Sequence, residues 1–278
     1  MSTPAPAEDG LHPTGTAPAG EVRARRAGFG ADLLTVASRA VRRIPRAPEE
    51  IVPALVVPVF FFVVNLGSLQ KLAERDTGVN FKAFQLPVAI IFAVTGISRA
   101  SDLVTDIQGG YFDRLLMTPV RRLALLLGLM VADIVLVIAL TIPVLVMGFA
   151  VGVRFKTGPV GVIVFMALAG LWGLVFTGFP YAIALKTGNP GAVASSFVLF
   201  FPFAFLTTSF LPRKALTGWL SAVAGVNPVT YLLDGLRSLE VTGWDGVALG
   251  KALAAIAAVG VVSIGLALAA LRGRVRRG

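Results

Sequence analysis

Long stretches without a single charged side chain dominate this sequence. Seven of them, 16 to 29 residues long, lie at residues 51–70, 83–98, 134–153, 157–185, 187–212, 215–233 and 252–271. A helix needs about 20 apolar residues to cross the hydrocarbon core of a bilayer. Only 14% of the residues are charged, whereas a soluble domain carries about 25%. We therefore expect an all-α integral membrane protein.

The stretch 215–233 differs from the other six. It contains Gly218, Asn227 and Pro228, which a helix facing lipid would not accommodate at its centre. Without it, six transmembrane helices remain, and both termini lie on one side of the membrane. That side then holds 16 of the 25 Lys and Arg residues and the other side holds 9. Because positive charge accumulates on the inner side, we expect both termini in the cytoplasm.

The N-terminal region precedes the first predicted span and falls into two parts. Residues 1–27 are rich in Pro, Ala, Gly and Thr and are expected to form a disordered cytoplasmic tail without a secretory signal. Residues 28–46 place apolar side chains at helical spacing and arginines on the opposite face, which favours an amphipathic helix in the interface. A simple positive anchor is the alternative. Residues 47–272 then form the six-span domain, and residues 273–278 form a basic cytoplasmic tail.

Several classes of chemistry do not fit this composition. The sequence has no cysteine and one histidine, His12, so we expect no disulfide, thiolate, metal or Ser-His-Asp site. The phosphate-binding pattern GxxxxGK[ST] does not occur, so we expect no ATPase activity in this chain. Asp133 is the only charge deep within a predicted span, whereas an ion-coupled carrier needs several. We assign Asp133 a structural role. The basic charge follows the topology, so nucleic-acid binding is not expected.

Two segments outside the spans carry distinctive patterns. The first, residues 101–122, is longer than a hairpin needs; glycines interrupt it, and a short helix is expected over 111–117. The second, residues 210–237, leaves the fifth span through Pro212 and continues through Trp219-Leu220 to Asn227-Pro228. Because proline suits the first position of a helix, Asn227 is expected to cap a helix that begins at Pro228.

Together these segments resemble the ABC type-2 transporter permeases. In that family the first segment reads as an acidic residue, a glycine, a short helix with Leu-Leu, then Thr-Pro-Val and a basic residue, and it is matched here over residues 106–121. The second reads as Pro, Trp-Leu, Asn-Pro-hydrophobic-Thr-Tyr and a downstream Asp or Arg, matched over residues 212–237. The resemblance covers about residues 30–272 and is closest to the daunorubicin-resistance type of drug efflux permease.

The resemblance implies a dimeric permease with two separate nucleotide-binding ATPase subunits on the cytoplasmic side. ATP and Mg would bind to those partners, and this chain would hold no cofactor. The second membrane subunit is either another copy or a related permease. A cytoplasmic coupling helix would seat in the ATPase through Asp106, Gly109, Gly110, Tyr111, Phe112, Asp113, Arg114, Leu115, Leu116 and Pro119. The alternative is an amphipathic turn packed on the chain's own spans.

The same resemblance assigns a substrate path and an outer gate. The path would run between the two copies and be lined by Phe92, Thr95, Phe197, Phe200, Phe201, Phe203, Phe205, Thr207 and Thr208. Packing or lipid contact is the alternative for each Phe. Short re-entrant helices on the outer face would form a gate with Pro212, Trp219, Asn227, Pro228, Tyr231, Asp234 and Arg237. The segment 28–46 would connect to the ATPase, with Arg39, Arg42 and Arg43 reaching lipid phosphates.

The function that follows is ATP-driven export across a bacterial cell membrane. Aromatic walls with a few hydroxyls suit a large hydrophobic or amphiphilic compound, such as a drug or natural product. Export of a lipid-linked glycan is a second possibility within transport. A non-transporting membrane scaffold, which uses the same loop to hold a partner complex, is the alternative from another class. The sequence leaves open the substrate, the pathway and the identity of the second permease.

Overall fold

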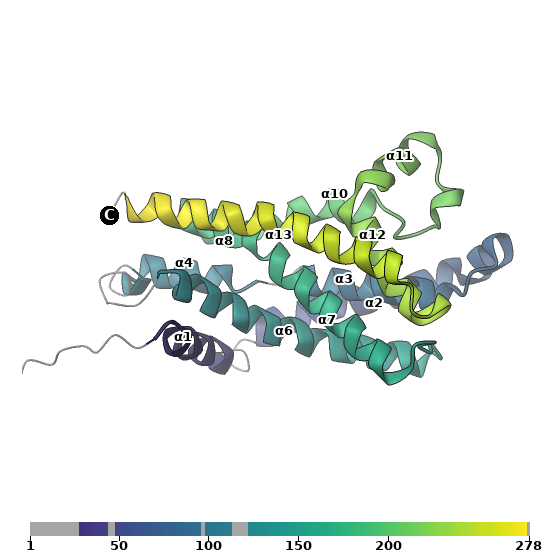
Figure 1. Ribbon diagram of the computed structural model, residues 1–278, viewed down its shortest axis with the longest axis horizontal. Coiled ribbons are helices and arrows are strands. Elements are labelled where there is room, and N and C mark those ends of the chain that lie inside the picture. The colour runs from purple at the N-terminus through teal and green to yellow at the C-terminus, as the bar shows by residue number, and fades with distance from the viewer. Residues whose placement is uncertain (1–27, 44–47, 96–97, 113–121, 277–278) are drawn as a thin grey trace, which may run out of the picture.

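The protein is all helical over the part that the computed structural model describes, residues 28–43, 48–95, 98–112 and 122–276. The helices run roughly along one long axis (Figure 1). The long elements are α1 (Phe29–Arg43), α2 (Pro48–Thr77), α3 (Phe81–Thr95), α6 (Arg122–Ala150), α7 (Gly158–Phe176) and α13 (Gly246–Val275). The shorter ones are α4 (Ala100–Gln108), α8 (Gly178–Thr187), α9 (Pro190–Ser195), η2 (Ser196–Leu199), α10 (Phe200–Phe205), η3 (Arg213–Ala215), α11 (Gly218–Val226), α12 (Pro228–Arg237) and η4 (Ser238–Thr242).

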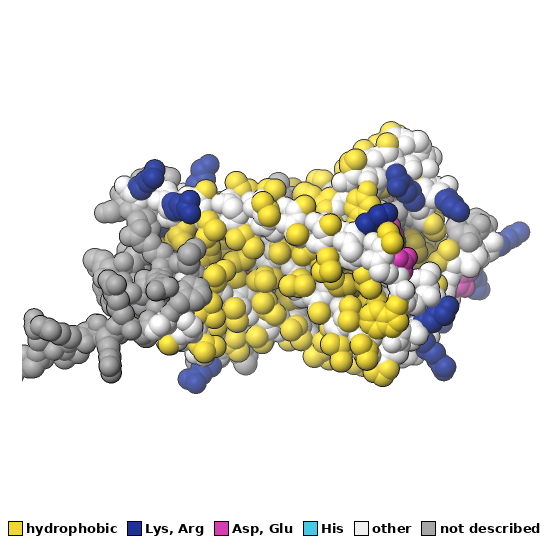
Figure 2. Space-filling model, viewed as in Figure 1, with side chains coloured by type: hydrophobic (Ala, Val, Ile, Leu, Met, Phe, Trp, Pro, Cys, Tyr) yellow, Lys and Arg dark blue, Asp and Glu magenta, His cyan; other side chains and the backbone are white. Residues whose placement is uncertain are grey.

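Two ends of the molecule can be distinguished. The basal end carries α1, α4 and the C-terminal end of α13, and the distal end carries α11, α12 and η4 (Figure 1). Figure 2 shows Lys and Arg side chains at both ends and a band of hydrophobic side chains between them. This distribution is the one that a bilayer requires, because charged groups are costly in hydrocarbon.

Five helical segments among the described residues are long and apolar enough to cross a membrane. They are Ile51–Arg75, Phe81–Gln108, Leu126–Ala150, Gly158–Thr187 and Gly246–Arg274. They overlap five of the six predicted spans, which confirms a multi-pass membrane protein. The six-span count stays a prediction, because the stretch 187–212 yields only a shorter apolar helix, Pro190–Phe205.

The stretch 187–212 is divided into α9, η2 and α10. After α10 the chain leaves the helix: the N–H of Leu206 still donates to the carbonyl of Pro202, 3.1 Å away, but Thr207 and Ser209 then bond back to the Ala204 carbonyl. Side-chain hydroxyls that satisfy helical carbonyls in this way compete with continued helix. The helical part therefore ends near Phe205.

As the sequence analysis predicted, the stretch 215–233 does not form one continuous helix. α11 and α12 meet at Asn227, whose backbone is extended, with φ of −75° and ψ of 123°. Pro228 occupies the start of α12, where its missing N–H costs nothing. Re-entry of this segment into the membrane stays a prediction.

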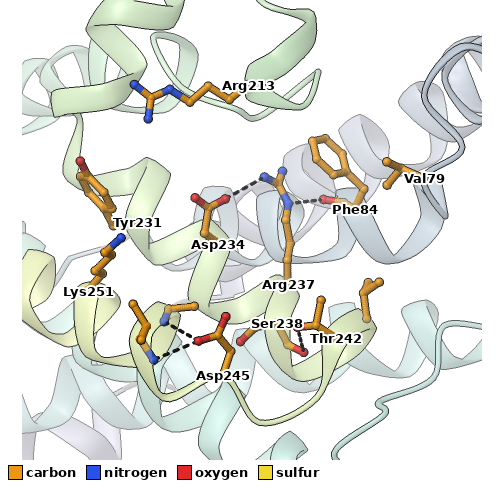
Figure 3. A pocket seen from close by; sticks show the side chains of 13 residues that line it. Val79, Phe84, Arg213, Tyr231, Asp234, Arg237, Ser238, Thr242, Asp245 and Lys251 are labelled. Carbon is orange, nitrogen blue, oxygen red and sulfur yellow. Dashed lines mark hydrogen bonds and ion pairs between the residues drawn. The ribbon is translucent and has the colours of Figure 1, made fainter.

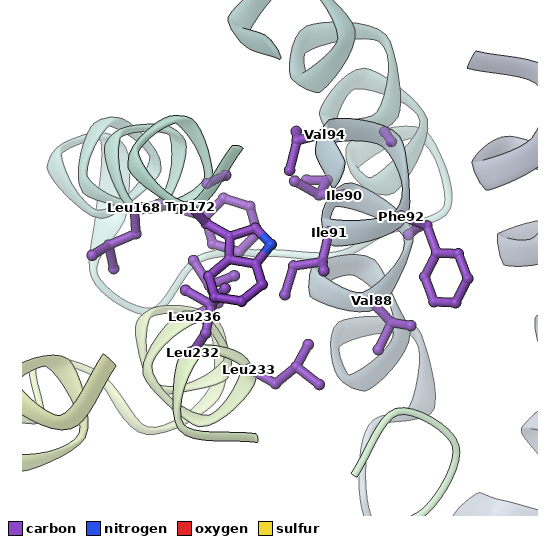
Figure 4. Close-up of a cluster of buried hydrophobic side chains, with 14 of the residues drawn as sticks. Val88, Ile90, Ile91, Phe92, Val94, Leu168, Trp172, Leu232, Leu233 and Leu236 are labelled. Atoms are coloured by element: carbon purple, nitrogen blue, oxygen red, sulfur yellow. The ribbon is translucent and has the colours of Figure 1, made fainter. Parts of the chain in front are cut away.

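The core of the bundle forms around α3. Nearly every side chain of α3 is buried, and α2, α6, α7 and α12 pack against it. Trp172 of α7 is fully buried and lies between Ile90, Ile91 and Val94 of α3 and the leucines of α12 (Figure 4). Its indole N–H donates to the Thr95 hydroxyl at 2.9 Å, so the one polar atom of the ring is satisfied within the apolar core.

The amphipathic helix expected over residues 28–46 is present as α1, and residues 44–46 lie outside the described residues. α1 packs against α6 at the basal end. A Cβ on Gly128 of α6 would lie only 2.7 Å from the Cβ of Val36, so the glycine allows the two helices to approach closely. The predicted tail at 1–27 also lies outside the described residues. Of the predicted C-terminal tail at 273–278, residues 273–275 belong to α13, and residues 277–278 lie outside the described residues.

Candidate functional site: two helical ends and an aromatic cluster

The basal end brings predicted coupling residues together with α1. A guanidinium nitrogen of Arg39 lies 3.3 Å from a carboxylate oxygen of Asp106 in α4. The same guanidinium lies 4.1 Å from the centre of the Tyr111 ring. Arg39 was expected to contact lipid phosphates, but in the structure α4 and Tyr111 hold it. α1 and the predicted coupling segment therefore form one connected surface.

The end of α4 has the backbone that its two glycines permit. The backbone N–H of Gly109 donates to the Thr105 carbonyl at 2.9 Å and ends the helix. Gly110 follows with a φ of +68°, a conformation that glycine adopts without strain. Phe112 is buried in a cluster with helices α4, α8 and α13, whereas Tyr111 is 40% exposed. Tyr111 is thus the accessible aromatic of this pair. The other predicted coupling residues, Asp113, Arg114, Leu115, Leu116 and Pro119, lie outside the described residues.

Beneath α4 lies a buried polar network that the sequence analysis found only in part. The Asp133 carboxylate accepts the backbone N–H of Arg99, at 2.9 Å, at the start of α4. The Arg99 guanidinium, itself 3% exposed, donates to Asp102 one helical turn later at 2.7 Å. Tyr181 of α8 lies beside the Asp133 carboxyl. Asp133 thus fastens α4 to α6, the structural role that we assigned to it.

Five of the predicted path residues meet in one aromatic cluster, which we define as Phe61, Phe92, Phe197, Phe200, Phe201 and Phe205. The Phe92 ring centre lies 5.1 Å from that of Phe200 and 5.8 Å from that of Phe205. Edge-to-face pairs at such separations are favourable. Phe200 is fully buried, while Phe201 and Phe205 are 42% and 36% exposed. The aromatic cluster therefore extends from the core to the surface of the chain.

A small cavity of about 110 Å³ lies beside this cluster. Thr95 and Phe197 line it, together with Ser98, Ser101, Phe176, Pro180, Val193, Ala194 and Ser196. Within one chain this cavity is too small for a drug-sized molecule, which occupies about 300 Å³ or more. A larger path would have to form against a second subunit.

The two threonines predicted for the path have a different environment. The Thr207 hydroxyl donates to the Ala204 carbonyl at 2.8 Å. Thr208 receives two bonds from the Arg237 guanidinium, one to its hydroxyl at 3.0 Å and one to its carbonyl at 2.8 Å. Both threonines are 2% exposed. Within the single chain they stabilise the turn after α10.

Arg237, a predicted gate residue, connects three parts of the distal end. Besides Thr208, it donates its Nε–H to the Phe84 carbonyl at 3.2 Å, and its guanidinium lies 3.5 Å from the centre of the Phe84 ring. Asp234 lies 3.9 Å away. Burial lowers the pKa of Arg237 to about 10, while Asp234 and Glu240 oppose that shift. The side chain links α12 to α3 and to the turn after α10.

Asn227, another predicted gate residue, makes three hydrogen bonds. Its side-chain oxygen accepts the N–H of Val229 at 3.0 Å, which confirms the predicted cap on α12. Its amide nitrogen donates to the carbonyls of Phe203 and Leu206 at 3.0 and 2.9 Å. These last two bonds give the end of α10 partners that its own helix no longer supplies.

The remaining predicted gate residues are arranged around α11. The Tyr231 hydroxyl donates to the Gly225 carbonyl. Trp219 is 68% exposed, and Pro212 precedes η3. The residues predicted to form a gate therefore occupy one region, with Asn227, Tyr231 and Arg237 making its internal bonds.

Glu240 is a distal residue that the sequence analysis did not single out. It lies in η4, is 4% exposed, and neither carboxylate oxygen has a hydrogen-bond partner among the described residues. Burial raises the pKa of this carboxyl well above its ordinary value, and the nearby Arg237 charge only partly offsets that effect. No sequence signal marks this glutamate, because its burial depends on the tertiary position of η4, which packs against α12 and α7.

No group of three or more metal-ligating side chains occurs among the residues that the structure describes.

Comparison with known proteins gives a consistent result. Residues 31–241 match the family model described as ABC-2 type transporter. The chain is 26% identical over 219 residues to the probable doxorubicin resistance ABC transporter permease protein DrrC of Mycobacterium tuberculosis, covering 77% of this chain and 79% of the relative. It is 25% identical to the daunorubicin resistance ABC transporter permease protein DrrB1 of Streptomyces coeruleorubidus, covering 80% and 78%. A putative transport permease, ycf38, of Cyanophora paradoxa is 24% identical, covering 75% and 73%.

Proposed function

Because the chain belongs to the ABC-2 type transporter family, we propose that it is the membrane subunit of an ATP-driven exporter of hydrophobic or amphiphilic compounds. The observation that carries this proposal is the family match over residues 31–241. The anthracycline-resistance names of its relatives support a drug or natural product as substrate. We place the protein in a bacterial cell membrane, with both termini in the cytoplasm and with Pro190–Phe205 contributing the sixth span.

ATP hydrolysis belongs, in this proposal, to a separate ATPase subunit that binds ATP and Mg. The coupling surface is the basal end, where α1 and α4 are joined by the Arg39–Asp106 ion pair of 3.3 Å. Tyr111 is exposed on this surface and is suited to contact a partner. The network of Arg99, Asp102 and Asp133 ties α4 to α6, so a movement of α4 is passed to a span. Such rigid-body transmission is a common form of switching.

The substrate path is proposed to lie between two membrane subunits. The aromatic cluster reaches the surface at Phe201 and Phe205, and α2 beside it is largely unburied within one chain. A second copy or a related permease placed there would enclose an aromatic wall. Aromatic faces bind large apolar rings by stacking and by burial of apolar area.

Efflux measurements test this proposal. The permease is expressed in a drug-sensitive host with its ATPase subunit, and a fluorescent anthracycline is followed as it leaves preloaded cells. We expect faster efflux with the active ATPase than with an ATPase that cannot hydrolyse ATP. The variant Phe201→Ala should slow efflux. Its matched control is Val146→Ala, because Val146 is an exposed apolar residue of α6 outside the cluster. This control should leave efflux unchanged.

The scaffold alternative gives a different result in the same experiment. A scaffold would co-purify with its ATPase but would move no compound at either ATPase activity. Equal efflux with active and inactive ATPase at matched membrane levels, for all amphiphilic compounds tried, would exclude an exporter of this class.

A further inference from the structure

Two adjoining cavities lie at the distal end of the molecule. The larger, of about 470 Å³, is bounded by α12, the start of α13, Val79, Phe84 and Arg213 (Figure 3). The smaller, of about 420 Å³, lies between the α11–α12 junction and α13. Tyr231 and Lys251 line both cavities. The two spaces therefore form one site with two arms.

The larger arm is charged, and its cations are only partly neutralised. Five charged side chains line it: Arg213, Asp234, Arg237, Asp245 and Lys251. The Asp245 carboxylate caps α13 by accepting two backbone N–H bonds of 2.9 and 3.0 Å, and Asp234 pairs with Arg237 at 3.9 Å.

Two cations remain without such a partner. Arg213 and Lys251 form no ion pair or side-chain hydrogen bond with the residues that the structure describes, although the charge of each also acts on Asp234. Both side chains are exposed and line the cavity (Figure 3). The Arg213 side chain can lie here because residue 225 is a glycine. A Cβ on Gly225 would lie only 2.3 Å from a guanidinium nitrogen of Arg213. An anionic ligand that contacts both Arg213 and Lys251 would complement the charge of this arm.

The smaller arm is apolar and runs along a membrane-spanning helix. Ala254, Ala255 and Ala258 line it on α13, opposite Val226 and Pro228. Together with Lys251 these alanines follow the spacing of one helical face, and the row extends about 10 Å along the axis. The arm leads from the charged cavity toward the middle of the span Gly246–Arg274. Its shape and chemistry suit a hydrocarbon chain.

We propose that the two arms form a binding site for one anionic phospholipid of the leaflet at the distal end. The phosphate lies between Arg213 and Lys251, and an acyl chain follows Ala254 to Ala258. A lipid in this position contacts α12 and α13, which pack against each other, and joins them to Arg213 in the segment before α11. The site is separate from the aromatic cluster, so the inference does not depend on the transported compound.

Lipid binding to the full-length chain tests the charged arm. The purified permease, stripped of lipid in detergent, is titrated with phosphatidylglycerol or phosphatidylcholine and examined by native mass spectrometry. We expect one tight site for phosphatidylglycerol, which Arg213→Gln with Lys251→Gln weakens about tenfold, as expected for the loss of charged hydrogen bonds. The matched control, Arg154→Gln with Lys156→Gln, removes two exposed cations of the same end outside both cavities and should leave binding unchanged.

A second pair of variants tests the apolar arm. Ala258→Phe fills the arm, whereas Ala257→Phe adds the same ring at an adjacent position that lines neither cavity. Only the first should weaken phosphatidylglycerol binding, and glycerol 1-phosphate should not compete. Unchanged binding in the Arg213/Lys251 variant overturns the site. Competition by glycerol 1-phosphate, with no effect of Ala258→Phe, overturns the lipid and leaves a small phosphate compound as the ligand.

Discussion

At the scale of single residues, Arg237 joins the most separated parts of the distal end. Its guanidinium donates to the Thr208 hydroxyl and carbonyl and to the Phe84 carbonyl, and it stacks on the Phe84 ring. A lysine keeps the charge but has neither the planar fork nor the stacking face. We expect Arg237→Lys to lower the free energy of unfolding by about 2 kcal/mol, measured by thermal unfolding in detergent. Asp234→Asn is the control, because its carboxylate is 55% exposed and its loss should have little effect.

Glu240 gives a pH dependence whose sign follows from its burial. Burial raises the pKa of this carboxyl well above its ordinary value, so the folded chain binds the proton more tightly than the unfolded chain. The resulting stability is fully present below the unfolded pKa, about 4.3, and is lost as the pH rises through the folded pKa. We expect the melting temperature to fall with rising pH. Arg237 is the charged neighbour that opposes this shift.

The variant Glu240→Gln isolates this effect. An amide of the same shape has no proton to lose in this range, so its melting temperature should vary less with pH. It should exceed that of the natural chain by a few degrees at high pH. Equal slopes for the two proteins between pH 5 and pH 9 would show that another group is responsible.

At the scale of elements, the crossing of α8 and α13 depends on the absence of one side chain. A Cβ on Gly178 would lie 2.6 Å from the backbone carbon of Ser263, and the Ser263 hydroxyl donates to the Val175 carbonyl at the same crossing. Small residues let membrane helices approach at this distance. Gly178→Ala should therefore cost about 1–3 kcal/mol of stability through forced separation of the helices.

A glycine without neighbours provides the control for this crossing. A Cβ on Gly265, in α13, meets nothing within 4 Å, so Gly265→Ala should leave the protein as stable or slightly more stable. Thermal unfolding of the two variants in the same detergent compares them directly. Equal melting temperatures would mean that the helices separate without cost.

Elements with a local signal could be predicted from the sequence. Charge-free runs located the five long spans, since hydrocarbon excludes charge wherever a helix lies. The break between α11 and α12 and the cap at Asn227 followed from Asn-Pro chemistry alone. The division of 187–212 into three short pieces was not predicted, because a charge-free run does not reveal the hydroxyls that bond back to Ala204.

Contacts between distant segments had no such signal. The Arg39–Asp106 pair joins residues 67 positions apart, and the Asp133–Arg99 bond joins residues 34 apart. Phe112 was expected to enter a partner, yet it is buried in a cluster with side chains of α4, α6, α8 and α13. Which apolar side chains a helix buries within its own chain depends on the tertiary arrangement, and periodicity alone could not separate Phe112 from the exposed Tyr111.

At the scale of the whole molecule, the basal and distal ends should face opposite sides of the membrane, with the basal end in the cytoplasm. The apolar band between two charged ends (Figure 2) indicates the axis, and the excess of Lys and Arg on the side of the termini predicts the direction. The natural sequence has no cysteine, so single cysteines report on one site each. Gly218 starts α11 with open space around it, and Gly109 ends α4.

An impermeant thiol reagent added to intact cells should label Gly218→Cys and not Gly109→Cys. Both should react once the membrane is permeabilised, which controls for access to each thiol. The orientation should persist because inverting the protein would move the charged side chains of both ends through the hydrocarbon core. Each such transfer costs several kcal/mol. Labelling of Gly109→Cys but not Gly218→Cys in intact cells would reverse the orientation, and it would remove the basal end from reach of a cytoplasmic ATPase.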